Sequence, residues 1–316
     1  MSIRGSARAF APASVGNVGV GFDVLGHALD AVGDLVVASR SDIPGVSVTG
    51  ITGVVADLPT NVERNTAGRA VQSMWDDMQA GFGVTLGSVK GIPLGSGRGG
   101  SAASAVAAVG AAIALLPEPV DLDGLFPYAL IGEAVASGSV HADNVAASLF
   151  GGLVYAYAAG DGDVRNARVP VPAGLQCVLV HPHCEIQTRD ARLALNADVA
   201  LPIAVEHSAN LAGVILACHS GDLELLRRSL RDVLVEPQRA HLVPGFAKVK
   251  QAALAAGALG CSLSGSGPSL FAWAETTFAR DIATAMSRVF ASDKMACDVW
   301  VSAIDAPGAR LTEQVE

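Results

Sequence analysis

A glycine-rich run at residues 93–104, Pro-Leu-Gly-Ser-Gly-Arg-Gly-Gly-Ser-Ala-Ala-Ser, stands directly before a stretch of small apolar residues. A turn of this kind entering a helix brings several unpaired backbone N–H groups to one point, where the helix dipole adds partial positive charge. Gly95, Gly97, Gly99 and Gly100 permit positive φ and let the main chain approach an anion without interference from Cβ atoms. The run therefore predicts a phosphate site at a helix N-terminus, as in an enzyme that handles nucleotides.

The run fits other glycine-rich motifs less well. It lacks the Gly-Lys-Ser/Thr ending of a Walker A motif. Its Gly-x-Gly-x-x-Gly spacing at 95–100 also occurs in dinucleotide sites, which need a strand just before the loop and an acid ending the next strand. Here Gly91 and Pro93 precede the glycines, and the candidate acid, Asp121, follows a turn. A dinucleotide site is disfavoured, whereas a helix start that binds no ligand stays open for the run alone.

Three further segments, at 11–26, 139–152 and 260–271, accompany the glycine-rich run. In this order the four segments resemble the superfamily of galactokinase, homoserine kinase, mevalonate kinase and phosphomevalonate kinase. Its homoserine kinase branch is resembled in particular by Asn-x-Gly-x-Gly-Phe-Asp, His-x-Asp-Asn and Glu-Pro-x-Arg at 17–23, 141–144 and 236–239. The resemblance covers the chain from about residue 8 to residue 305.

The resemblance implies a fold and an activity. Mixed strands and helices without strict alternation already favour an α+β architecture. The resemblance adds a ribosomal-protein-S5-like N-terminal domain that binds ATP, expected over 1–170, and a ferredoxin-like substrate-binding domain over 171–316. The active site would lie between them. The implied reaction is magnesium-dependent transfer of a phosphoryl group from ATP to L-homoserine, giving O-phospho-L-homoserine on the route to threonine.

The resemblance assigns the nucleotide to the glycine-rich run and to two asparagines before the first long helix. These residues are Pro93, Leu94, Gly95, Ser96, Gly97, Arg98, Gly99, Gly100, Ser101, Ala102 and Ala103, with Asn61 and Asn65 at the adenosine. A turn and a helix cap are equally common uses of asparagine and stay open for Asn61 and Asn65. The run also departs from the commoner form Gly-Leu-Gly-Ser-Ser-Ala, because Arg98 replaces the leucine and Gly100 the first serine. Arg98 either contacts a phosphate or points into solvent.

Magnesium prefers oxygen ligands, typically a carboxylate and a hydroxyl together with phosphate oxygens and water. The resemblance implies Glu133 as the carboxylate and Ser101 as the hydroxyl. A solvated helix glutamate is the alternative for Glu133, but its place in a mainly apolar helix favours a ligand. Ser101 can also cap the helix that it begins.

The acceptor end must hold a free amino acid, whose carboxylate and ammonium need opposite charges. Arginine binds a carboxylate with two parallel hydrogen bonds, and aspartate suits an ammonium group. By resemblance, Arg192 and Arg239 are the arginines, with isolated surface arginines as the alternative. The remaining side is expected to be lined by Asn17, Asp23, His141 and Asp143.

Asp143 and Asn144 are the candidate catalytic residues. Related sugar and mevalonate kinases use an aspartate as base, and the pair falls where that aspartate is expected. In the homoserine kinase branch the acid instead holds the substrate, with the asparagine near the reacting hydroxyl. An asparagine does not usefully accept a proton, so we favour transfer by positioning and charge stabilisation, without a dedicated base.

Two other functions are compatible with parts of this pattern. Another small-alcohol kinase, of the mevalonate or sugar type, would have no substrate ammonium for Asp23 or Asp143. A non-catalytic nucleotide-binding regulator would be expected to lack a metal ligand, whereas Glu133 and Ser101 are both present.

Composition limits the possible partners. The net charge of −9 argues against nonspecific binding to nucleic acid or to anionic membranes. Five scattered cysteines lack zinc-like spacing and fit a reducing compartment. The apolar stretch at 102–116 is shorter than a membrane-spanning helix requires. We expect a cytoplasmic protein that binds no nucleic acid or membrane and forms a homodimer.

These residues need elements to hold them. Apolar spacing predicts helices at 65–80, 101–116, 122–137, 203–218, 222–234, 244–256 and 277–290. Strands are predicted at 35–38, 46–48, 84–89, 153–158 and 176–181, with a turn at 161–163, a linker at 170–174 and two late strands.

Overall fold

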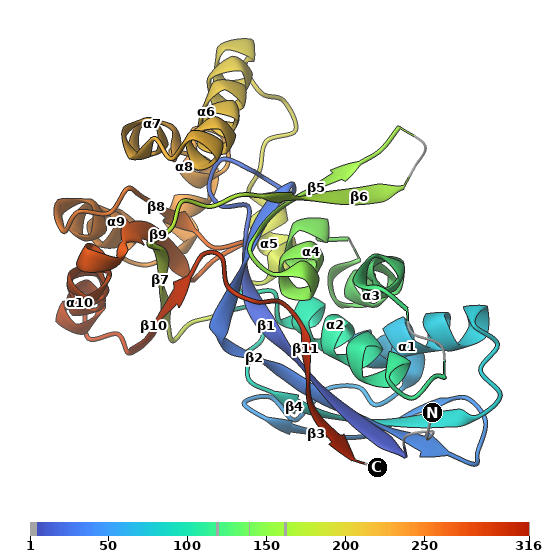
Figure 1. Ribbon diagram of the computed structural model, residues 1–316. Helices are drawn as coiled ribbons and strands as arrows, with labels where there is room; N and C mark the ends of the chain where they lie inside the picture. The colour runs from blue at the N-terminus through green and yellow to red at the C-terminus, as the bar shows by residue number, and fades with distance from the viewer. Residues whose placement is uncertain (1–4, 118–119, 139, 161–162, 316) are drawn as a thin grey trace.

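The computed structural model describes residues 5–117, 120–138, 140–160 and 163–315. Within these ranges the strands form two separate sheets (Figure 1). The order in the first sheet is β11 (Arg310–Val315), β1 (Ser6–Gly16), β2 (Leu25–Ser41), β4 (Gly83–Lys90) and β3 (Val46–Gly53). The sheet is extended from β2 by the hairpin of β5 (Leu153–Ala158) and β6 (Val164–Val169).

Helices pack on one face of the first sheet: α1 (Thr66–Asp77), α2 (Gly100–Ile113), α3 (Leu122–Ser137) and α4 (Ala142–Phe150). The central helix is α2, which contacts β1 and β2 on one side and α1 and α3 on the other. Most of its residues are buried, and its many alanines let it approach the strands closely. This packing fixes the start of α2, where the glycine-rich run ends.

The second sheet is antiparallel throughout and runs β10 (Cys297–Ala303), β7 (Leu175–Pro182), β9 (Leu270–Glu275), β8 (Gly260–Leu263). Its helices are α9 (Phe246–Ala255), against β8, and α10 (Thr276–Ser292), against β7 and β10. The buried residues of this unit form a core of their own around Phe246, Ile282 and Phe290. The predicted α+β class with two units is confirmed.

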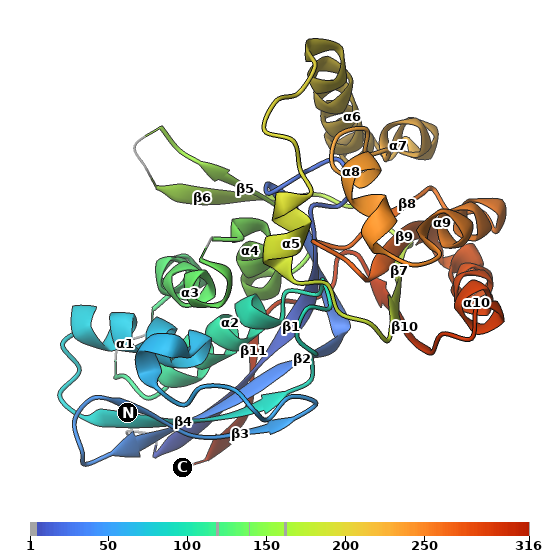
Figure 2. The ribbon, with the colours of Figure 1, turned by 180° about the vertical axis from the view of Figure 1, so that it is seen from behind.

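The shorter helices lie outside the two sheets. In the first unit η1 (Val62–Arg64) precedes α1, and four short helices follow β7 along the chain before α9: α5 (Thr188–Leu193), α7 (Leu223–Ser229), α8 (Glu236–Arg239) and η2 (Ala240–Leu242). The long helix α6 (Leu201–Ser220) projects from the body beside α7 (Figures 1 and 2). It is long and apolar enough to cross a membrane, and most of it is exposed. A single helix of this kind is weak evidence for a membrane, and its exposed side chains include Val205 and Leu216.

Several predicted bounds differ from those observed. The helix predicted at 222–234 ends at Ser229, because the Asp232 carboxylate accepts N–H groups from residues 234–236 and so organises the start of α8. The strand predicted at 35–38 lies in the second half of the 17-residue strand β2 (Leu25–Ser41). Of the turn at 161–163, residues 161–162 lie outside the described residues.

The end of the chain returns to the first unit. After β10 the chain crosses back, and β11 pairs antiparallel with β1. It covers a strand edge that would otherwise be open to pairing with another chain. Residues 310–315 therefore complete the first sheet, although they follow the second unit in sequence.

Candidate active site

The glycine-rich run forms the loop between β4 and α2. Gly95, Gly97 and Gly99 have φ of 56°, 70° and 64°, the left-handed region that glycine adopts without strain. Added Cβ atoms would also collide. A Cβ on Gly97 would lie 2.4 Å from the Ser264 carbonyl oxygen, and one on Gly99 would lie 2.1 Å from the Ser14 hydroxyl. These glycines are required both by the backbone and by the close packing behind the loop.

Four successive carbonyl groups of the loop, at residues 95–98, are held by donors outside it. In order, the donors are the Ile186 N–H (3.1 Å), the Ser269 hydroxyl (2.6 Å), the Ser264 hydroxyl (2.7 Å) and the Ser14 N–H (3.1 Å). By contrast, we find no acceptor among the described residues for the N–H groups of 95–100. The loop therefore keeps its N–H groups available for an anion at the start of α2.

A buried polar cluster lies beneath the end of the loop and was missed from the sequence. The Lys90 ammonium forms an ion pair with Asp34 and donates to the Gly100 carbonyl (2.8 Å) and to the Ser104 hydroxyl (2.6 Å). The other Asp34 oxygen accepts the Gly91 N–H at 3.0 Å. The cluster fixes both ends of the loop. Its sequence signal is a lone lysine ending an apolar strand directly before the glycines.

Glu133 of α3 meets the conditions for a cation ligand. Its side chain is buried, and one carboxylate oxygen accepts a hydrogen bond from His141 Nδ1 at 3.0 Å. The other oxygen, Oε2, has no partner among the described residues. No group of three His, Cys, Asp or Glu residues able to hold a metal occurs in the described ranges, so the protein alone would not cage one. This donor set fits Mg²⁺, which usually binds one or two carboxylates together with phosphate oxygens and water.

The Glu133 carboxylate affects the pKa of His141. Burial alone would lower the pKa of His141, but the hydrogen bond and charge of Glu133, with the charge of Asp143, raise it above its usual value. The protonated ring would hold Glu133 in place from one side and leave Oε2 to the other.

Asp23 and the two predicted arginines meet around the ring of Phe22. The Asp23 carboxylate accepts two hydrogen bonds from Arg192, at 2.7 and 3.0 Å. The guanidinium carbons of Arg192 and Arg239 lie 5.0 and 5.3 Å from the Phe22 ring centroid. Arg239 is buried and donates to the Ala191 carbonyl at 2.9 Å. Burial and the neighbouring Arg192 charge lower the pKa of Arg239 to about 10, so it remains charged.

Asn17 connects the segment at 11–26 to the segments at 139–152 and 260–271. Its N–H donates to Asp143 Oδ2, its side-chain amide donates to the Gly265 carbonyl, and its Oδ1 accepts the Asp23 N–H, each at 3.0 Å. Asn17 and Asp23 have φ of 67° and 58°, which is uncommon for residues other than glycine. Backbone of this kind concentrates at functional sites.

Asp143 is buried at the start of α4 and shares its oxygens between two donors. Besides the Asn17 N–H, it accepts the side-chain amide of Asn144 at 3.0 Å, and Asn144 Oδ1 accepts the Ser14 hydroxyl at 2.9 Å. Burial raises the pKa of Asp143 to about 6, although the Asn17 hydrogen bond opposes the shift. This carboxyl is therefore mostly deprotonated at pH 7, although its pKa lies close to neutral.

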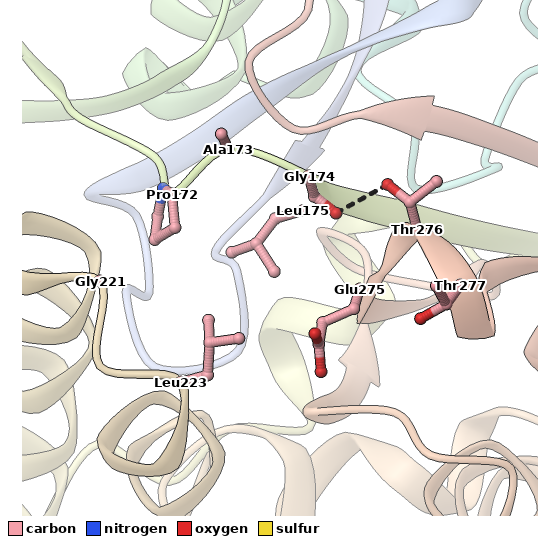
Figure 3. Close-up of a pocket in the computed structure, with 9 residues that line it drawn as sticks. All are labelled: Pro172, Ala173, Gly174, Leu175, Gly221, Leu223, Glu275, Thr276 and Thr277. Atoms are coloured by element: carbon pink, nitrogen blue, oxygen red, sulfur yellow. Dashed lines mark hydrogen bonds between the residues drawn. The ribbon is translucent and has the colours of Figure 1, made fainter.

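These groups face one cavity of about 620 Å³ between the two units. Its lining includes the predicted residues from Pro93 to Ser101, together with Asn17, Asp23, Asn65, Glu133, His141, Asn144, Arg192 and Arg239. Asp143 lies behind Asn17 and Asn144 rather than in the lining. A second hollow of about 340 Å³, near Gly174 and Glu275, contains none of the predicted residues (Figure 3).

Some predicted residues lie elsewhere than expected. Ala102 and Ala103 are fully buried in α2 and do not line the cavity, and neither does Asn61. The Asn65 side chain caps α1 by accepting the Gly68 N–H at 2.9 Å. The solvent alternative for Arg98 is wrong, because its side chain is 1% exposed.

Comparisons with known proteins agree with this geometry. The family model described as GHMP kinases N terminal domain matches residues 65–152, and GHMP kinases C terminal matches residues 214–292. The chain is 50% identical to homoserine kinase of Xylella fastidiosa (strain 9a5c) and 51% identical to that of Xanthomonas campestris pv. campestris (strain B100). Each alignment covers 96% of this chain and 94% of the relative.

The fold is also similar to those of solved kinase structures. The crystal structure of homoserine kinase from Cytophaga hutchinsonii superposes with a TM-score of 0.95 at 42% identity, covering 99% of both chains. Mevalonate kinase of L. major, solved with R-mevalonate, has a TM-score of 0.68 at 16% identity over 96% of this chain and 98% of its own. At that identity the second likeness shows the fold alone.

Proposed function

The chain belongs to the GHMP kinase family, and on that premise we propose that it phosphorylates the side-chain hydroxyl of L-homoserine with ATP. The product would be O-phospho-L-homoserine, and the step would serve threonine biosynthesis. The observation that carries the proposal is the cavity itself. It joins a phosphate loop at one end to Asp23, Arg192 and Arg239 at the other.

The charges at the acceptor end suit an α-amino acid. Asp23 offers a negative charge for the ammonium, and Arg192 and Arg239 offer two guanidinium groups for the carboxylate. In the ligand-free protein Asp23 and Arg192 neutralise each other. A zwitterionic substrate can replace that ion pair with two of its own, because its ammonium pairs with Asp23 and its carboxylate pairs with Arg192.

The nucleotide phosphates would lie against the N–H groups of 95–100 and the start of α2. Ser101 and Glu133 would hold Mg²⁺, which supplies charge neutralisation at the phosphates when bound. Asn65 lines the cavity where the adenosine is expected to bind, and its side chain also caps α1.

Transfer would proceed by positioning. Asn144 lines the cavity between the phosphate loop and the acceptor end, and its orientation is fixed by Ser14 and Asp143. Asp143 is engaged by two donors and set back from the cavity, which favours a role in holding Asn17 and Asn144. The hydroxyl proton would pass to the transferred phosphate, without a dedicated base.

An assay of ADP release over several alcohols tests this proposal. With ATP and Mg²⁺, L-homoserine should be the preferred acceptor over R-mevalonate and galactose. Faster turnover of either alternative would contradict the assignment within the family. ATP binding without turnover of any alcohol would favour a nucleotide-binding regulator.

We also propose a homodimer acting in the cytoplasm without nucleic acid or membrane. Exposed apolar side chains on α6, such as Val205 and Leu216, support association, and the net charge of −9 disfavours polyanions. Light scattering should report a particle of two chains. A single chain at micromolar concentration would contradict the dimer.

A further inference from the structure

Arg98 occupies the position where the loop departs from the commoner superfamily form. Its main chain remains part of the loop, where its carbonyl accepts the Ser14 N–H. Its side chain turns toward the second sheet, and the guanidinium carbon lies 4.5 Å from the ring centroid of Trp300 in β10. Arg98 therefore ties the phosphate loop to the second unit by a cation–π contact.

The charge of this buried side chain is poorly compensated. Neither Nε nor Nη1 of Arg98 has a hydrogen-bond partner among the described residues. No carboxylate in the described part of the chain forms an ion pair with Arg98. Asp298 and Asp34 attract it only from a greater distance. Burial lowers the pKa of Arg98 to about 10, which still leaves it protonated at neutral pH. A buried, unpaired charge destabilises a folded protein.

Arg98 also belongs to the anion site and to the lining of the cavity. Gly97 and Gly99, on either side of Arg98, belong to the loop whose N–H groups are free for phosphate. Charges in a poorly hydrated environment are weakly screened, so a guanidinium there acts on a bound phosphate more strongly than a surface lysine would. A bound polyphosphate would supply the negative charge that Arg98 lacks.

We propose that Arg98 is a positioning residue whose buried, unpaired charge strengthens phosphate binding while it destabilises the ligand-free protein. Trp300 holds the guanidinium in place behind the loop. The inference rests on the proposed function, because it takes ATP as the ligand of the loop. It predicts opposite signs for two measurements, whereas a purely structural role would lower stability and affinity together.

The test compares Arg98→Leu, which restores the commoner residue, with Arg98→Lys, which keeps the charge. Calorimetry gives the dissociation constants of ATP, ADP, AMP and adenosine, and thermal melting gives the stability of the ligand-free protein. For Arg98→Leu, the melting temperature of the ligand-free protein should rise, and ATP should bind about tenfold more weakly or worse. The loss should shrink through ADP and AMP and vanish for adenosine. Arg98→Lys should stay within about threefold of the wild type for ATP.

Matched controls separate the possible failures. Arg40 also stacks on an aromatic ring, that of Phe82, but lies outside the cavity lining, so Arg40→Leu should leave ATP affinity unchanged. Arg98→Met is the second uncharged variant if the leucine variant folds poorly. An Arg98→Leu protein with wild-type ATP affinity, or one that loses melting temperature and adenosine affinity together, overturns this inference alone. Failure of the wild type to bind ATP overturns the proposed function and this inference with it.

Discussion

The Asp23 carboxylate and the Arg192 guanidinium form a two-pronged ion pair, at 2.7 and 3.0 Å, across 169 residues of sequence. It joins the first motif to α5, and both partners line the cavity. Because each partner is about one-third exposed, the pair itself adds little stability. The pair presents opposite charges at one place in the cavity. The ammonium and carboxylate of an amino acid can bind there to Asp23 and Arg192 in place of their mutual contact.

The first prediction concerns the two arginines. Arg192→Lys and Arg239→Lys should raise the KM for L-homoserine and leave the KM for ATP nearly unchanged. Loss of one charge-assisted contact costs on the order of 1.5–3 kcal/mol, or about one to two powers of ten in binding. Lysine should retain only part of the affinity, because a point charge does not reproduce two parallel hydrogen bonds. An equal rise in the KM for ATP would place these arginines at the phosphates.

The second prediction concerns Glu133 as a magnesium ligand. Glu133→Gln keeps the shape and removes the charge, so activity should fall by about two powers of ten or more while the melting temperature is retained. Calorimetric titration of Mg²⁺ into the nucleotide complex should show weaker binding than in the wild type. Near-normal activity at ordinary magnesium concentrations would exclude the role.

The third prediction is a pH dependence of stability that arises from Asp143. Its pKa is raised by burial from 3.8 to about 6 in the folded protein. The folded state therefore holds this proton over a range in which the unfolded chain has released it. The contribution is favourable below about pH 4 and is lost as pH rises through about 6, by roughly 3 kcal/mol.

Asp143→Asn removes that titration. The difference in unfolding free energy between the variant and the wild type should shift in favour of the variant between pH 4 and pH 7. Urea unfolding at several pH values measures it. A difference that does not change with pH would show that the buried carboxyl has an ordinary pKa.

The fourth prediction concerns the backbone of the phosphate loop. Gly97→Ala should raise the KM for ATP strongly, because its Cβ would lie 2.4 Å from the Ser264 carbonyl oxygen at a positive φ. Gly87→Ala in β4 is the matched control, since nothing lies within 4 Å of its added Cβ. Equal ATP kinetics in the two variants would contradict the loop geometry.

The local sequence pattern was enough to predict elements whose contacts are near in sequence. The helix at 122–137 has its predicted bounds, because the Asp121 side chain caps its start and Gly138 ends it in a left-handed conformation. The phosphate loop was likewise visible from its glycines. The pairing of Glu133 with His141, eight residues apart, adds a contact that the motifs did not specify.

Contacts distant in sequence were not predictable from pattern. Asp34 and Lys90 are 56 residues apart, and only the pairing of β2 with β4 brings them beneath the loop. The return of β11 to β1 depends on an open strand edge, which no local spacing reveals. Arg98 looked like a solvent or phosphate residue, because Trp300, its aromatic partner, lies about 200 residues later on another sheet.

The proposed function requires that the cavity select an α-amino acid that carries a hydroxyl. The most direct test is kcat/KM with ATP and Mg²⁺ for L-homoserine, for 4-hydroxybutyrate, which lacks the ammonium, and for 3-amino-1-propanol, which lacks the carboxylate. We predict O-phospho-L-homoserine as the product, and a loss of about two powers of ten or more for each truncated acceptor, since each leaves a charged group of the cavity unpaired. Turnover of either truncated alcohol at the rate of L-homoserine would contradict this selectivity.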